Sequence, residues 1–133
     1  MNRTDTVAAH EVAAEISRLI QTGVKMSLGF HSAAVSSNEP GTGLFLPGYT
    51  FLAKIIAFRK DGTRGSSARI MRVTVTLNSN DLYNIDVRYA ARRSVVGDTV
   101  HFQLDDIYAS MLNKFLLALD YDGDSVLNPR IVG

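Results

Sequence analysis

The chain of 133 residues contains no cysteine, and this absence excludes several classes of protein at once. Without cysteine there is no disulfide scaffold, no thiol nucleophile and no cysteine-ligated zinc site. The absence also fits a reducing compartment. A domain of this length buries roughly two-thirds of its unfolded surface, so it can fold without cross-links. We therefore predict a single domain, 1–133.

Long apolar runs are also missing. No window approaches the ~20 apolar residues that a membrane-spanning helix needs. A secretory signal would need a continuous apolar stretch near the start of the chain, but His10, Glu11 and Glu15 interrupt that segment. We expect a cytoplasmic protein with no membrane partner.

Recognisable catalytic and metal-binding motifs are absent as well. The three histidines are far apart and lack metal-ligand spacing; they are His10, His31 and His101. The segment Asp120–Asp124 resembles the start of a calcium loop, but Ser125 replaces the required glycine and Ile131 the closing acid. A polar turn explains this segment more simply, with a cation as the alternative. We predict no cofactor, no metal and no enzymatic activity.

What the chain does have is a strongly uneven distribution of charge. Residues 54–93 hold nine basic and three acidic residues, a net charge of +6. The rest holds five basic and ten acidic residues, a net charge of −5, so the total is only +1. Segregation of this kind suggests one surface for a polyanion and another for water.

The apolar periodicity predicts an α+β fold with an antiparallel meander. The pattern in 1–23 is that of an amphipathic helix ending at Gly23. Residues 24–48 are predicted to form a short strand at 24–30 and a long loop at 31–48, with a hairpin possible around 41–43. Four or five strands follow in 49–104, with a turn at 60–67 around Asp61-Gly62 and another at 79–81. In 105–133, Asp105 or Asp106 would cap a helix from Ile107 to about Leu119 that packs on the sheet or on a dimer partner.

The polar face of this sheet is the candidate RNA-binding surface. Arginine and lysine neutralise phosphates, and threonine and asparagine bond to sugars and bases. Its predicted members are Lys54, Arg72, Thr74, Thr76, Asn84, Arg88 and His101. Tyr49, Tyr83 or Tyr89 would add stacking if any of them faces outward. The alternative is an ordinary solvated sheet face.

Several stretches follow one another in the order of strands and helix that is typical of one protein family. They are 51–60, 69–77, 99–104, the helix from Ile107, and the ending Leu127-Asn128-Pro129. In this order the chain resembles the coat proteins of single-stranded RNA bacteriophages, the levivirus-like family. It departs from them in having an N-terminal helix where a β-hairpin is usual, and an extra strand at 83–89.

The resemblance implies a homodimer whose two chains form one sheet, and a shell built from such dimers. The sheet would face inward and bind RNA, and the helices would clasp the partner and face outward. The protein would then belong to a virion assembled in the bacterial cytoplasm. The predicted dimer and assembly residues are Ile107, Met111, Leu112, Phe115 and Leu116.

Two other functions remain open from the residues themselves. One is a small, non-enzymatic module of phage or plasmid origin that binds single-stranded nucleic acid on a sheet or five-stranded barrel. The other is an α+β protein whose partner is another protein.

Overall fold

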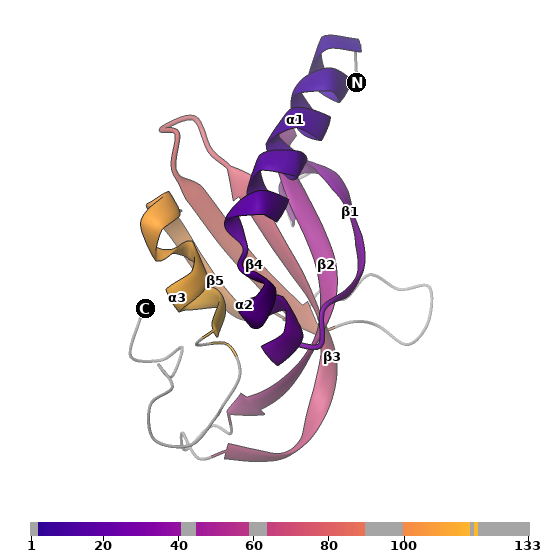
Figure 1. Ribbon diagram of the computed structural model, residues 1–133, viewed down its shortest axis with the longest axis vertical. Coiled ribbons are helices and arrows are strands. Elements are labelled where there is room, and N and C mark those ends of the chain that lie inside the picture. The colour runs from indigo at the N-terminus through magenta and orange to yellow at the C-terminus, as the bar shows by residue number, and fades with distance from the viewer. Residues whose placement is uncertain (1–2, 41–44, 59–63, 90–99, 118, 120–133) are drawn as a thin grey trace.

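A computed structural model describes residues 3–40, 45–58, 64–89, 100–117 and 119, and its fold is α+β as predicted. The elements in chain order are α1 (Arg3–Leu19), α2 (Thr22–Ser27), β1 (His31–Asn38), β2 (Phe45–Phe58), β3 (Arg64–Leu77), β4 (Tyr83–Tyr89), β5 (Val100–Ile107), the 3-10 helix η1 (Ala109–Met111) and α3 (Leu112–Leu117). The strands form one antiparallel meander in the order β1-β2-β3-β4-β5. The helices α1, α2 and α3 lie on the same side of it (Figure 1).

The core lies between these helices and one face of the sheet. Strand alternation places Phe51, Val73, Val87 and Phe102 side by side across four strands, and all four are buried. The helical side chains packed on this face include Ile16, Ile20, Val24, Leu28, Leu112 and Leu116. Each large apolar side chain buried in this way contributes about 1.5–3 kcal/mol.

The strand predicted at 24–30 is not formed: α2 covers Thr22–Ser27, and a turn follows at 28–29. Val24 and Leu28 are both buried, and their spacing of four residues suits one face of a helix. The first helix therefore ends at Leu19, and Gly23 lies inside α2 rather than stopping a helix. The chain leaves α2 through Gly29, whose φ of 60° suits a residue without a Cβ atom.

The long loop predicted at 31–48 was also wrong in large part. Residues His31–Asn38 form β1, and β2 begins at Phe45. Serine and alanine favour strands weakly, but the edge of β2 offers a row of backbone partners, and tertiary pairing overrides the weak preference. The pairing of β1 with β2 has two register irregularities, between His31 and Ala34 and between Ser36 and Asn38. The hairpin expected around 41–43 lies outside the described residues.

The C-terminal helix is shorter and later than predicted. Sheet pairing carries the chain through Asp105 and Asp106 to Ile107, which lies opposite Tyr83 and is buried. Asp106 therefore has a positive φ of 59° within β5 and caps no helix. Helical structure begins with η1 and continues as the six residues of α3. The segment Asp120–Asp124 lies outside the described residues.

Of the two turns predicted between strands, the one at 60–67 is shorter than expected and the one at 79–81 is confirmed. The turn expected at 60–67 ends earlier, because β3 already begins at Arg64, and Asp61-Gly62 lies outside the described residues. The turn at 79–81 is confirmed. The Asn78 side-chain oxygen accepts hydrogen bonds from the backbone N–H groups of Asn80, at 2.9 Å, and Leu82, at 3.3 Å.

Candidate nucleic-acid interface on the open sheet face

The face of the sheet opposite the helices is here called the open face. Its position follows from strand alternation and from the register of the ladders. Its polar members on β2 to β5 are Thr50, Lys54, Arg72, Thr74, Thr76, Asn84, Asp86, Arg88, Gln103 and Asp105. Six of the seven predicted RNA-binding residues are therefore on one face. The seventh, His101, lies in β5, but its side chain is outside the described part of the chain.

One end of the open face, here called the basic end, consists of Lys54, Arg72 and Arg88. Arg72 and Arg88 are direct neighbours across β3 and β4, and Lys54 lies opposite Ile70 on β2. Lys54 and Arg72 are exposed, and neither forms an ion pair with a described residue. Arg72 donates a hydrogen bond of 3.2 Å to Thr50 Oγ1, which orients its guanidinium and leaves further N–H donors for a ligand.

Arg88 differs from the other two cations because its charge is compensated. Its Nε lies 2.8 Å from Asp86 Oδ1, and its terminal nitrogen donates to Asp86 Oδ2 at 3.2 Å. Gln103 Nε2 also donates to Asp86 Oδ2, at 2.7 Å. Asp86 is only 8% exposed, so Arg88 supports a buried carboxylate. The uncompensated charge at the basic end therefore comes from Lys54 and Arg72.

The predicted threonines are on the open face but are buried. Thr74 is 4% exposed and Thr76 is 2% exposed. The Thr74 hydroxyl lies 3.1 Å from that of Thr50, which also bonds to the Val73 carbonyl oxygen and accepts from Arg72. Thr74 therefore helps to position Arg72 and is not itself placed to contact a ligand.

None of the three tyrosines considered for base stacking lies on the open face. Tyr49, Tyr83 and Tyr89 all belong to the opposite, helix-covered face. Tyr49 stacks on Phe30 with 6.0 Å between ring centroids. Tyr83 is 5% exposed, and its burial, with a smaller effect of the Glu15 charge, raises the pKa of its hydroxyl. The condition for aromatic stacking is not met by these three residues.

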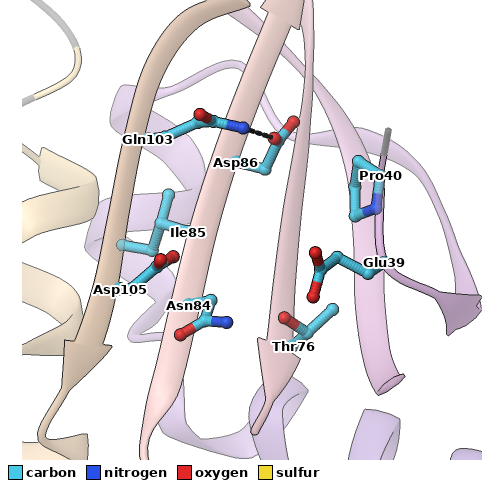
Figure 2. A pocket seen from close by; sticks show the side chains of 8 residues that line it. All are labelled: Glu39, Pro40, Thr76, Asn84, Ile85, Asp86, Gln103 and Asp105. Carbon is cyan, nitrogen blue, oxygen red and sulfur yellow. Dashed lines mark hydrogen bonds between the residues drawn. The ribbon is translucent and has the colours of Figure 1, made fainter. Parts of the chain in front are cut away.

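The other end of the open face carries a polar groove that the sequence did not reveal. The groove has a volume of about 200 Å³ (Figure 2), and it is lined by Glu39, Pro40, Thr76, Asn84, Ile85, Asp86, Gln103 and Asp105. It is here called the acidic groove. Glu39 was predicted to lie in a loop and Asp105 at a helix cap, so neither was expected beside the sheet face. The alternation in 83–89 already predicted that Asp86 shares a face with Arg88. This was the signal that the sequence offered for an acidic side chain on that face.

The five residues predicted for dimerisation are used inside the chain. Ile107, Leu112 and Leu116 are buried, and Met111 and Phe115 pack partly against the same core. Asn113 fixes α3 against the α1–α2 junction, donating to the Leu19 carbonyl oxygen and accepting from the Gln21 N–H, both at 2.8 Å. These contacts place the five residues in or against the core of their own chain.

Comparisons with models of protein families, with curated proteins and with solved structures find no match for this chain. Among the described helices none is both long and apolar enough to cross a membrane. Within the same residues, no three His, Asp or Glu side chains come together in a way that would hold a metal ion.

Proposed function

We propose that this protein is a non-enzymatic RNA-binding protein that holds the phosphate backbone against the basic end of the open face. The observation that carries this proposal is the exposure of Lys54 and Arg72 on a sheet face that α1, α2 and α3 leave uncovered (Figure 1). Neither cation has an ion-pair partner among the described residues. Cations in this setting displace the counterions of a nucleic acid, which favours binding regardless of sequence. Because Tyr49, Tyr83 and Tyr89 lie on the opposite face, the alternative of a single-strand-binding module that stacks bases on them is disfavoured.

Two uncompensated cations make for weak binding by one chain. Each phosphate contact to a single strand contributes about −0.7 to the slope of log affinity against log salt, so two give about −1.4. Strong retention of RNA then requires many copies acting together, because linked sites multiply their effect. We therefore propose a self-associating structural protein, of which a phage coat is the specific form, with the open face turned toward the RNA.

The surface best suited to contact between copies is the outer edge of β1, which pairs with no strand that the structure describes. The strand His31–Asn38 contains no lysine, arginine, aspartate, glutamate or proline, and its side chains are mostly exposed. Charges, prolines and β-bulges usually keep an edge strand from pairing with another chain; β1 has an irregularity between His31 and Ala34, but lacks the other two devices. We propose that two copies pair along this edge, since the predicted helix residues are already buried in the core.

RNA binding is tested by removing the two uncompensated cations. We expect Lys54→Ala and Arg72→Ala each to weaken binding of single-stranded RNA and to flatten the salt slope by about 0.7. The measurement is a fluorescence anisotropy titration at several salt concentrations. Arg18→Ala, which removes an exposed cation from α1 on the opposite side, serves as the matched control. Unchanged affinity and slope in both test variants would exclude the basic end as the binding surface.

Arg88→Ala is a less direct test of the same surface. Its removal leaves the buried Asp86 carboxylate without its cation, and breaking such a pair costs about 3–5 kcal/mol. A loss of RNA binding in this variant could thus come from the missing contact to RNA or from the lower stability of the fold, and the measurement would not separate the two.

Self-association is tested by placing a charge on the β1 edge. Val35 is 37% exposed on β1, and we expect Val35→Lys to shift the protein from dimers or larger particles toward the 14.5 kDa monomer. The matched control is Leu117→Lys, at an apolar residue of α3 that is 42% exposed. Size-exclusion chromatography with light scattering gives the masses, and electron microscopy detects particles. A parent protein that is monomeric at all concentrations would rule out the coat.

A further inference from the structure

The acidic groove contains two carboxylates whose charge is not compensated by any residue that the structure describes. Asp86 is paired with Arg88 and Gln103, but Glu39 and Asp105 have no hydrogen bond or ion pair with any described residue. Glu39 follows β1 and Asp105 lies in β5, so the two carboxylates approach from opposite walls (Figure 2). The groove therefore favours a cation and repels the phosphates proposed for the basic end.

A buried hydroxyl in the same groove gives an independent indication of a ligand. Thr76 is 2% exposed, and no described residue forms a hydrogen bond with its hydroxyl. Its methyl group faces Gly48, since Thr76 Cγ2 would lie 2.9 Å from a Cβ atom added there. The hydroxyl is accordingly turned toward the groove, on the side of Asn84 (Figure 2). Buried polar groups nearly always have a partner in protein, water or ligand, so this hydroxyl is available to a group bound in the groove.

The remaining amide at this end is oriented by its own bonds. Asn84 Oδ1 accepts from Asn78 Nδ2 at 2.9 Å and from the Asp106 N–H at 3.1 Å. Asn78 Nδ2 also donates to Asp106 Oδ1 at 2.9 Å. This network fixes the groove's wall around the turn at 79–81. A preformed wall lowers the cost of binding because little has to be ordered.

The form of the groove indicates which kind of cation it takes. A divalent metal is disfavoured, because no three of the described acidic or histidine side chains are grouped to hold one. At about 200 Å³ the groove is smaller than the roughly 300–1,000 Å³ typical for whole small molecules, so it suits a head group. A guanidinium is planar and carries five N–H donors in a fixed fork, which can reach acceptors on two sides at once.

We infer that the acidic groove binds a guanidinium group, with Glu39 and Asp105 accepting its N–H donors from opposite walls and the Thr76 hydroxyl accepting another. The group comes either from a free arginine-like compound or from an arginine side chain of a second copy of this chain. The chemistry of recognition is the same in both cases. This binding is independent of the RNA proposal, which rests on the other end of the face.

The test is a titration of the full chain with N-acetyl-arginine amide, followed by backbone amide NMR. We expect shifts centred on Thr76, Asn84 and Gln103 and a dissociation constant on the order of 1 mM, typical of one head group. Glu39→Gln and Asp105→Asn should each weaken binding at least about fivefold, because each removes a charge-assisted bond. Glu11→Gln, at an exposed carboxylate on α1, should leave it unchanged.

Two further variants separate recognition from charge alone. Thr76→Val keeps the side-chain shape without the hydroxyl, and we expect it to fold as well as the parent but bind more weakly. N-acetyl-lysine amide should bind several-fold more weakly than the arginine compound, since an ammonium lacks the planar fork. Equal binding of the two amides, or shifts that Glu39→Gln and Asp105→Asn do not reduce, would overturn the inference. So would an absence of shifts at about 50 mM.

The source of the guanidinium is distinguished by the state of association. If it belongs to a second copy, Glu39→Gln or an excess of the arginine amide should lower the molar mass seen by light scattering. If it is a free compound, the amide should bind while the mass stays the same. The variants Lys54→Ala and Arg72→Ala should bind the amide as the parent does, which keeps this result separate from any failure of RNA binding.

Discussion

Gly48→Ala is expected to destabilise the protein by more than about 3 kcal/mol, at the upper end of the range for overpacking a well-packed site. Gly48 is buried in β2 opposite Thr76, and a Cβ atom there would lie 2.3 Å from the Val75 carbonyl oxygen. It would also approach Thr76 Cα at 3.0 Å. These are backbone atoms of the neighbouring strand, so relief requires β2 and β3 to move apart.

The matched control for this effect is Gly23→Ala. Gly23 lies in α2, and nothing lies within 4 Å of the position that its Cβ atom would take. Alanine is favoured over glycine inside a helix, so this variant should gain about 0.5–1 kcal/mol. Urea unfolding measures both variants against the parent. A midpoint for Gly48→Ala equal to that of the parent would show that the β2–β3 ladder is not packed as described.

The central strands could be predicted because each carries a clear alternation that one covered face imposes. Met71, Val73 and Val75 alternate with Arg72, Thr74 and Thr76, and the structure places the first set in the core. Any slip by one residue would bury the arginine, so burial and pattern agree on one register. The same logic correctly placed Lys54, Arg72 and Arg88 on one face.

The ends of the sheet could not be predicted because their local sequence is ambiguous. Serine and alanine in β1 give no strand signal, and β1 forms only because β2 presents an unpaired edge. At the other edge, Asp105 and Asp106 have the chemistry of a helix cap, but the burial of Ile107 beside Tyr83 keeps them in β5. Long-range pairing decided both cases.

The candidate site was predicted in part for the same reason. Its basic end depends on residues from strands with clear alternation. The acidic groove depends on Glu39, which reaches the sheet only because β1 exists, and on Asp105, which is on the open face only because β5 extends to Ile107. Because β1 was predicted as a loop and the end of β5 as a helix cap, the sequence did not predict the acidic groove.

Leu116→Ala is expected to cost about 2–5 kcal/mol, the range for truncating a fully buried leucine. Leu116 is 0% exposed and belongs to the core formed with α1, α2 and the sheet. Its neighbour Leu117 is 42% exposed, so Leu117→Ala should cost less than about 0.5 kcal/mol. The two variants remove the same atoms from adjacent positions, and urea unfolding of both isolates the effect of burial.

Measuring the loss of stability in Leu116→Ala at several protein concentrations shows whether α3 packs in its own chain or on a partner. If Leu116 packs in its own chain, the loss of stability is the same at every protein concentration. If α3 instead clasped a partner, as the coat resemblance implies, Leu116→Ala would weaken association itself, and the loss of stability would change with protein concentration. We expect no concentration dependence of the loss, because Asn113 ties α3 to the α1–α2 junction and Leu112 and Leu116 complete the core within one chain. Assembly would then join chains that are already folded, and the β1 edge is the surface that we propose for this contact.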